Sequence, residues 1–234
     1  MEYNNGASSA RKRMQRGFTL ANIVIVLVAA YVLLSRSDVP PLINGILLPE
    51  GRPLATFSLL DHRSQVFNNS HLQGRWSLVS YGFTTCPDIC PTTLSELSVV
   101  ARRLQERGHN DLNVLFYTVD HRRDTVSQLA SYIPYFHPDF IGLTHVDGGD
   151  NGHLPFEQGL GIMAQLVPVT DSEGDLSAND YEVSHGVTLF LLNPKGQLQA
   201  IFKPRYNDPS HGVVFEPDTV IKDYLAIRNY LSAL

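Results

Sequence analysis

The stretch Tyr81-Gly82-Phe83-Thr84-Thr85-Cys86-Pro87-Asp88-Ile89-Cys90-Pro91 contains both cysteines of this 234-residue protein. The preceding run from Trp76 to Phe83 is apolar and aromatic enough for a buried strand. After it, apolar residues recur with the spacing of an amphipathic helix that opens at Pro91-Thr92-Thr93. These helical positions are Leu94, Leu97, Val100, Ala101 and Leu104. The two cysteines are therefore expected where a strand is followed by a helix.

A position at the start of a helix favours reactive or metal-binding thiols over purely structural ones. A proline suits the first turn of a helix because its missing N–H would have no partner there. Unpaired N–H groups and the positive end of the helix dipole favour an anion such as a thiolate. If the turn is already helical, Cys86 and Cys90 lie on one face, close enough for a disulfide or a shared soft metal. The alternative is a purely structural disulfide, although so short a loop gives it little entropic benefit.

The N-terminal region has the pattern of a membrane segment. Four basic residues, Arg11, Lys12, Arg13 and Arg16, precede the uncharged run 18–34, which is near the lower length limit for a spanning helix. We expect a cytoplasmic basic tail over 1–17 and a transmembrane anchor over 18–34, because basic residues tend to stay on the cytoplasmic side. A cleaved signal peptide is the alternative, but the run exceeds most signal cores and no clean small-residue cleavage site follows.

Charge and composition limit the choice of partners. Residues 1–34 have a net charge of +3, so the whole-chain value of −5 leaves −8 for the remainder. Such an acidic remainder argues against nucleic acid as a partner. The prolines between residues 35 and 53 predict an extended linker over 35–50 that holds the domain away from the membrane. A hydrophobic content of 43% fits a globular domain with a sizeable core, expected over 51–234.

The rest of the chain alternates between strand and helix patterns. Strands or hairpins are expected over 54–60, 65–67, 112–119, 140–145, 187–192 and 197–202. Helices are expected from the Asp120–Thr125 segment to about Phe136 and over 217–231, with a long polar insertion over 147–181 around a short helical piece. This order predicts an α/β fold of the thioredoxin-like type. Cys86 and Asp120 then both lie at carboxyl ends of strands, where ligands bind in open sheets.

Three segments together resemble the Sco family, also called SenC, of membrane-anchored copper proteins that help to assemble the CuA centre of cytochrome c oxidase. They are Tyr81-Gly82-Phe83-Thr84-Thr85-Cys86-Pro87-Asp88-Ile89-Cys90-Pro91-Thr92-Thr93-Leu94, Thr118-Val119-Asp120-His121-Arg122-Arg123-Asp124-Thr125 and Tyr181-Glu182-Val183-Ser184-His185. The resemblance extends from about residue 49 to the C-terminus. Its specific feature is the combination of Cys-x-x-x-Cys-Pro with a distant histidine just before a strand.

The resemblance implies that Cys86, Cys90 and His185 are copper ligands. Independently, two thiolates and an imidazole suit Cu(I) and can accommodate Cu(II), whereas zinc usually needs a fourth ligand. The implied function is non-catalytic delivery of copper to the oxidase subunit that contains CuA, with another copper chaperone as donor. The implied location is the bacterial inner membrane, crossed once, with the main domain in the periplasm. The lack of a long Arg/Ser-rich transit segment favours bacteria over mitochondria.

The remaining polar candidates are less specific. Asp120 is expected either to steady a ligand or a partner contact near the cysteines, without binding the metal itself, or to cap a helix. His121 stands where Sco proteins commonly have proline, and a second, weaker copper contact through it stays open. The other histidines have no ligand spacing in the sequence and rank well below His185; they are His62, His71, His109, His137, His145, His153 and His211.

The alternative function is a dedicated thiol–disulfide reductase for the copper-site cysteines of the oxidase, in which Cys86 and Cys90 form a redox disulfide. A general reductase is disfavoured, because thioredoxins place two residues between their cysteines and a proline where this chain has Val187. A peroxidase is also disfavoured, because the peroxiredoxin pattern needs a proline in place of Val79 and a threonine in place of Phe83.

Overall fold

The computed structural model describes residues 18–31, 39–145, 151–168, 181–205 and 215–233. The chain forms two compact units, the larger being Pro40–Leu231 and the smaller Met1–Val39 with Ser232–Leu234. In the smaller unit, residues 18–31 form helix α1. Within the described ranges, no helix combines the length and apolarity needed to cross a membrane. Residues 32–34 of the expected anchor lie outside those ranges.

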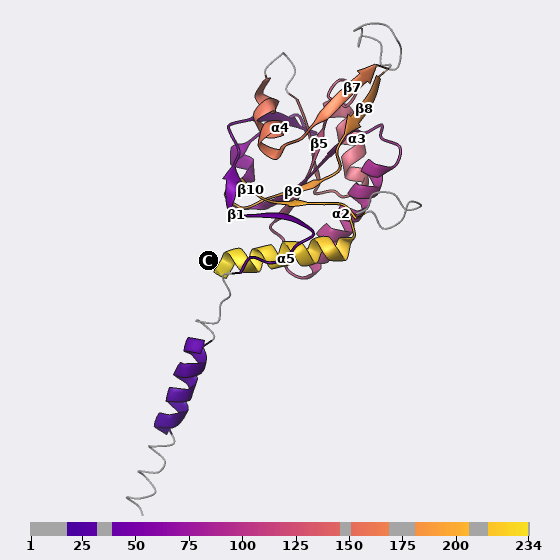
Figure 1. Ribbon diagram of the computed structural model, residues 1–234. Coiled ribbons are helices and arrows are strands. Elements are labelled where there is room, and N and C mark those ends of the chain that lie inside the picture. Colours follow the sequence, from indigo (N-terminus) through magenta and orange to yellow (C-terminus); the bar gives the residue numbers. More distant parts are fainter. Residues whose placement is uncertain (1–17, 32–38, 146–150, 169–180, 206–214, 234) are drawn as a thin grey trace, which may run out of the picture. The chain divides into compact units, whose positions relative to one another are not determined.

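The larger unit is organised around an eight-stranded mixed sheet (Figure 1). Its strand order is β1-β10-β9-β4-β5-β6-β2-β3, and β4, β5 and β6 are parallel to one another. The strands are β1 (Gly45–Pro53), β2 (Ser58–Asp61), β3 (Val66–Asn68), β4 (Trp76–Gly82), β5 (Leu112–Thr118), β6 (Ile141–Thr144), β7 (Ala164–Pro168), β8 (Tyr181–His185), β9 (Leu189–Leu192) and β10 (Gln197–Phe202). The helices are η1 (Asn69–Leu72), α2 (Ile89–Glu106), α3 (Val126–Tyr132), η2 (Ile133–Tyr135), η3 (Asn151–His153), α4 (Leu154–Leu160) and α5 (Pro217–Ala233).

Two apolar clusters cover the two faces of this sheet. Side chains alternate along each strand, so β4 directs Trp76 and Leu78 to one face and Val79 and Tyr81 to the other. Helices α2, α3 and α5 pack on the first face, whereas α4 packs on the second. Burying one large apolar side chain contributes about 1.5–3 kcal/mol. Strand β4, which leads into the cysteine loop, is therefore held in place by apolar packing on both of its faces.

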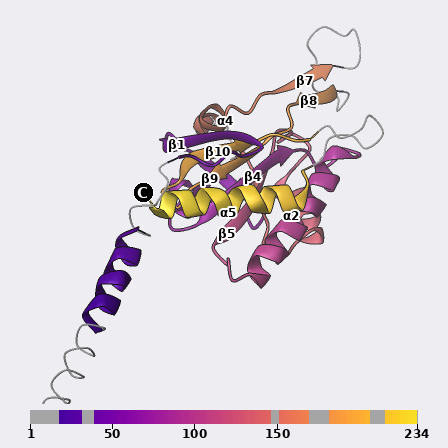
Figure 2. The same ribbon diagram turned by 60° about the horizontal axis from the view of Figure 1, so that its bottom comes forward.

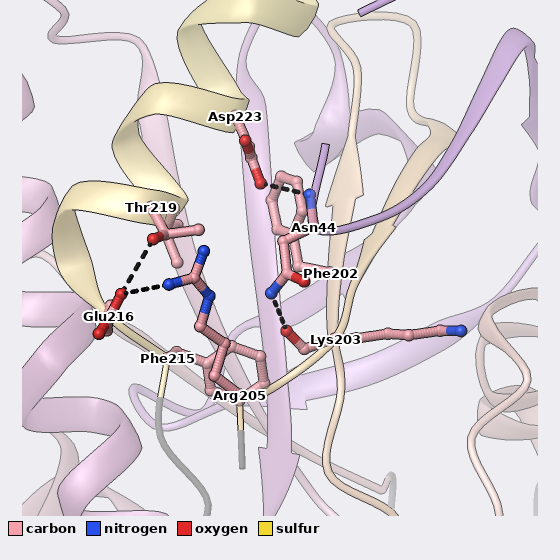
Figure 3. A pocket seen from close by; sticks show the side chains of 9 residues that line it. Asn44, Phe202, Lys203, Arg205, Phe215, Glu216, Thr219 and Asp223 are labelled. Carbon is pink, nitrogen blue, oxygen red and sulfur yellow. Dashed lines mark hydrogen bonds and ion pairs between the residues drawn. The ribbon is translucent and has the colours of Figure 1, made fainter. Parts of the chain in front are cut away.

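Polar contacts attach α5 to the edge of the sheet (Figure 3). Asp223 accepts a hydrogen bond from the backbone N–H of Asn44 at 2.8 Å, and the Asn44 side chain donates to the Lys203 carbonyl at 2.9 Å. Arg205 pairs with Glu216 at 3.0 Å, just before the helix begins. Burial raises the pKa of Asp223, and the Asn44 hydrogen bond opposes that rise. Figure 2 shows α5 lying along the sheet that these contacts reach.

The first strand begins inside the predicted linker. The sequence predicts an extended linker over 35–50, whereas residues 45–53 form the edge strand β1, paired antiparallel with β10. Pro49 lies where the register shifts between Leu47 and Arg52. An edge strand tolerates proline at such an irregularity because no neighbour needs its N–H. The folded unit therefore begins before residue 51, the expected domain start.

Helix boundaries near the cysteines also differ from the prediction. Helix α2 begins at Ile89, two residues before Pro91, so Cys90 lies in its first turn and Cys86 precedes it. Helix α3 begins after Thr125, whose side chain accepts a hydrogen bond from the Gln128 N–H. Because Thr125 caps this helix, the acidic residues before it are available for other contacts.

The expected insertion contains a second, two-stranded sheet. Strands β7 and β8 pair antiparallel, with Ala164 opposite His185. Helix α4 corresponds to the predicted short helical piece, while 146–150 and 169–180 lie outside the described residues. Figure 1 shows α4 and the β7–β8 pair at the same end of the main sheet. Residues 186–188 connect this ribbon to β9, and His185 contacts Tyr81 of β4 in the main sheet.

Candidate metal centre

The two cysteines lie on either side of the start of α2. Cys86 is half-buried in the loop after β4, and Cys90 is 4% exposed in the first helical turn. Both are free thiols, and the side chains are within hydrogen-bonding reach of each other. A Cβ atom at Gly82 would overlap the Cys90 sulfur, so glycine at the end of β4 leaves the space that this thiol occupies.

Burial dominates the acidity of Cys90. Desolvation raises its pKa far above the ordinary thiol value, and a backbone hydrogen bond from Phe83 opposes this only partly. For Cys90, burial therefore acts against the thiolate that the helix start was expected to favour. A bound metal ion would supply a compensating positive charge and favour the thiolate.

A buried carboxylate that the sequence did not single out holds the cysteine loop. Asp124 accepts hydrogen bonds from the Thr84 N–H at 2.8 Å, the Thr84 hydroxyl at 2.5 Å and the Thr118 hydroxyl at 2.6 Å. Burial raises the pKa of Asp124, and these three hydrogen bonds act in the opposite direction. Thr84 stands two residues before Cys86, so Asp124 joins the loop to the end of β5. The sequence assigned a cap only to the segment 120–125 as a whole, so it gave no signal that Asp124 is free of that role.

His185 lies at the end of β8, beside the cysteine loop. Its ring meets the Phe83 ring edge-on with centroids 5.6 Å apart, and it contacts Tyr81 at the same centroid distance. Its Nδ1 lies 2.7 Å from the Gly186 carbonyl, so we place the proton on Nδ1. Desolvation lowers the pKa of His185, and the Gly186 contact opposes this. A neutral ring with Nδ1 donating leaves the Nε2 lone pair for a metal.

The three expected ligands, Cys86, Cys90 and His185, lie around Phe83, but their ligating atoms do not all lie within 4.8 Å of one another. Phe83 links them, since its carbonyl accepts from the Cys86 N–H at 3.2 Å and its ring touches His185. In the described part of the chain, the only three ligating groups whose atoms all lie within 4.8 Å of one another are His145, His153 and Glu157. A metal bound by both sulfurs and His185 would therefore require these side chains to move toward one another.

Asp120 is connected to the strand that bears His185. Its carboxylate is fully buried, pairs with Arg123 and accepts a hydrogen bond from the Tyr181 hydroxyl at 2.5 Å. The Arg123 guanidinium stacks 4.1 Å from the centre of the Tyr181 ring. Tyr181 begins β8 and His185 ends it. Asp120 thus lies at neither thiol in the contacts described, and it fixes one end of the histidine strand.

A second group of potential ligands was missed in the sequence. His121, His145 and His153 stack on one another next to Glu157, and we call these four residues the histidine cluster. Desolvation, followed by the neighbouring imidazoles, lowers the pKa of His121 to about 4. Nothing in their spacing predicts this contact. The available clue was that His121 and His145 each follow the end of a strand, and parallel neighbours end at the same edge.

Comparison with known proteins agrees with this architecture. Residues 50–213 match the family model described as SCO1/SenC. The chain is 39% identical over 156 residues to a Stutzerimonas stutzeri protein named "Putative copper-binding protein", covering 67% of this chain and 72% of that relative. It is 34% identical over 177 residues to the human protein named "Protein SCO2 homolog, mitochondrial", covering 75% of this chain and 61% of the human protein.

Two solved structures with copper bound have a similar fold. Arabidopsis thaliana ScoI with copper bound matches with a TM-score of 0.60 and 27% identity over 76% of this chain and 99% of that chain. Yeast Sco1 with copper bound matches with a TM-score of 0.57 and 26% identity over 74% of this chain and 87% of that chain. The predicted thioredoxin-like α/β fold is confirmed. Since the family model covers more than half of the sequence, this chain belongs to the SCO1/SenC family.

Proposed function

We propose that this protein binds copper through Cys86, Cys90 and His185 and delivers it to the CuA centre of cytochrome c oxidase during assembly. The observation that supports this most is a free thiol pair and a neutral histidine on either side of Phe83. The copper-bound Arabidopsis and yeast relatives add support, because their fold is that of this chain.

The donor set suits a carrier rather than a catalyst. Two thiolates and one imidazole form a soft site that prefers Cu(I) and can also accept Cu(II). A three-coordinate ion leaves room for an incoming thiolate of an acceptor, so copper can pass by ligand exchange without release into solvent. The bound form of each cysteine is the thiolate, so uptake of copper displaces thiol protons.

The β7–β8 ribbon is proposed to set the position of His185. Closure of the three ligands requires the imidazole to approach the sulfurs, and β8 is attached outside the main sheet. At the other end of β8, Tyr181 is held by Asp120 and Arg123. In this proposal, Asp120 is a positioning residue that restricts where His185 can lie, and it does not bind the ion.

We further propose that residues 18–34 anchor the protein in the bacterial inner membrane, with residues 1–17 in the cytoplasm and the copper domain in the periplasm. The support for this is the sequence pattern of a basic cluster followed by an uncharged apolar run. The expected partners are the oxidase subunit that contains CuA and a second copper chaperone as donor. Resistance of the full chain to alkaline extraction from membranes tests the anchor, and extraction into the soluble fraction would oppose it.

The central experiment measures copper binding to the soluble part of the chain, residues 37–234, which includes the compact unit Pro40–Leu231. The reduced protein is titrated with Cu(I) against a competing chelator, beside the His185→Ala and His109→Ala variants. We expect one tightly bound copper per chain, weaker binding after His185→Ala, and unchanged binding after His109→Ala. Absence of tight copper from the reduced wild-type protein would contradict the proposed carrier function.

A transfer experiment separates delivery from the alternative thiol reductase. In delivery, the copper-loaded protein should load a reduced, metal-free CuA domain. In the reductase reaction, the metal-free protein should reduce a disulfide in an oxidised CuA domain, while Cys86 and Cys90 form a disulfide and two electrons and two protons pass to the client. Copper transfer without measurable disulfide reduction is expected. The reverse result would assign the thiol pair to redox chemistry.

A further inference from the structure

The histidine cluster is assembled from three parts of the chain at the carboxyl ends of β5 and β6. His121 follows β5, His145 follows β6 directly, and His153 precedes the first residue of α4. The rings of His145 and His153 stack with centroids 3.6 Å apart and 15° between their planes. His121 stacks on His145 with centroids 4.0 Å apart. Glu157 lies about one helical turn after His153, which precedes α4, so both side chains can point to the same side.

A buried tyrosine orients two members of this cluster. Tyr117 of β5 donates its hydroxyl proton to Glu157 Oε1 at 2.5 Å. The Tyr117 hydroxyl oxygen lies 2.7 Å from His145 Nε2. Because the Tyr117 hydroxyl proton is directed to the Glu157 carboxylate, the Tyr117 hydroxyl oxygen accepts a hydrogen bond from His145 Nε2–H. The Nδ1 lone pair of His145 is then left for another partner. A hydrogen bond of this kind on the far nitrogen is how proteins usually fix a metal-binding histidine.

The cluster lines a pocket that a small ion can enter. The pocket has a volume of about 420 Å³, and the lining includes all four members together with Met163 and Gln165. The side chains of His145 and Glu157 are 12% and 24% exposed. They are thus shielded from bulk solvent while remaining open toward the pocket. The ligating atoms of His145, His153 and Glu157 all lie within 4.8 Å of one another.

From this arrangement we infer that His145, His153 and Glu157 form a second metal site, distinct from the cysteines, for a divalent transition-metal ion. A tetrahedral ion with ligands at about 2.0–2.1 Å needs donor atoms roughly 3.4 Å apart. The ligating atoms lie within 4.8 Å of one another, so they must move closer together when an ion binds. His121 is stacked on His145 and lines the same pocket.

The donor set selects the class of metal. Two imidazoles and a carboxylate without a thiolate suit borderline ions such as Zn(II) and Cu(II), whereas the soft thiol pair suits Cu(I). For a given site of this kind, Cu(II) binds more tightly than Zn(II). The second site therefore holds an oxidised or redox-inert ion under conditions in which the cysteines hold Cu(I). This inference does not depend on copper delivery by the cysteines.

The test uses the full chain in mild detergent with both cysteines replaced, Cys86→Ser and Cys90→Ser, so that the thiol site is absent. Zn(II) and Cu(II) are added separately against a competing chelator. His153→Asn and Glu157→Gln are then added to this background, and His109→Asn serves as a matched control outside the cluster. Glu157→Gln keeps the shape of the side chain and an oxygen that can accept from Tyr117, so its fold is expected to survive.

We expect one Zn(II) or Cu(II) per chain, with affinity at least about tenfold lower in His153→Asn and in Glu157→Gln. The Cu(II) form should show nitrogen hyperfine coupling in its electron paramagnetic resonance spectrum, and this coupling should weaken after His153→Asn. His109→Asn should change neither quantity. Absence of binding, or binding that is unchanged in both cluster variants, would overturn the inference and leave the rings as packing partners only.

Discussion

The cysteine site and the histidine cluster lie at the same edge of the sheet but are built in different ways. The cysteines are four residues apart in one loop, and only His185 comes from a distant segment. The histidine cluster draws each ring from a different loop, and its contacts exist only because β5, β6 and α4 meet there. The first offers soft sulfur donors and the second nitrogen and oxygen donors. One end of the sheet thus presents two different sets of possible metal ligands.

The two regions also differ in how their geometry is fixed. In the cluster, the buried Tyr117 hydroxyl engages both His145 and Glu157, so two donors are oriented before any ion arrives. At the cysteines, Asp124 fixes the loop through Thr84, while His185 depends on the β7–β8 ribbon. If both proposed sites bind metal, the more firmly held cluster suits retention of an ion, and the cysteine site suits uptake and transfer.

The largest expected effect is the loss of Cu(I) binding when a sulfur is removed. Cys86→Ser or Cys90→Ser should lower Cu(I) affinity by about a thousandfold or more, because a hydroxyl is a poor ligand for a soft ion. Binding of Zn(II) at the histidine cluster should stay unchanged in the same variants. Competition with chelators selective for each ion measures both affinities. A parallel loss of Zn(II) would mean that the two regions form one site.

The next largest effect should follow from removing the packing under α4. Phe156 is fully buried and contacts Phe57 and Tyr117, with ring centroids 4.9 and 5.3 Å away. Phe156→Ala should lower the free energy of unfolding by about 3–5 kcal/mol. It should also weaken Zn(II) binding while Cu(I) binding at the cysteines remains. Denaturant unfolding and metal titration test this together, with the milder Phe156→Leu as control.

Tyr117→Phe isolates the orienting hydrogen bonds from packing. The ring is kept, but the hydroxyl that holds His145 and Glu157 is lost. Loss of such a supporting group typically costs about 10–100-fold in metal affinity, so Zn(II) binding should weaken by that factor. Thermal unfolding serves as the control for the fold. Unchanged Zn(II) affinity in a folded variant would show that the hydroxyl does not orient the donors.

The pH dependence of the two sites should differ. Burial raises the pKa of the Cys90 thiol, so at neutral pH this ligand must lose its proton to the solvent when copper binds. Cu(I) affinity should therefore rise with pH, by about tenfold per pH unit for each proton released. At the cluster, burial would raise the pKa of Glu157, but hydrogen bonds with His145 and Tyr117 outweigh it and lower that pKa. Its carboxylate is already ionised, so Zn(II) affinity should rise less steeply in titrations between about pH 7 and about pH 8.

The smallest expected effect concerns the far end of β8. Tyr181→Phe removes the hydroxyl that donates to Asp120 but keeps the ring under Arg123. It should weaken Cu(I) binding only a few-fold, about 1 kcal/mol, because one hydrogen bond that restrains the histidine strand is lost. The effect should vanish in a His185→Ala background, where the strand has no ligand to position. If Tyr181→Phe weakened Cu(I) binding equally in that background, Tyr181 would not act by positioning His185.

Much of the fold could be predicted because its information is local. The run 76–83 and the helical spacing after Pro91 predicted β4 and α2, and the hairpin and the final helix were expected near their observed places. The prediction over 35–50 differed because prolines resemble a linker, while pairing with β10 makes part of this segment a strand. Strands β7 and β8 were not predicted, since the polar surroundings hide a two-stranded ribbon.

By itself, the sequence determined that the two cysteines lie close together where a strand is followed by a helix. Two sulfurs four residues apart between a strand and a helix remain neighbours in almost any packing, because the chain between them is short. Only the tertiary structure decided which distant groups join them or form a second set. Asp124 reaches Thr84, and the three imidazoles stack, because parallel strands end at a common edge. Contacts between loops far apart in sequence arise from strand order, and no spacing in the sequence records that order.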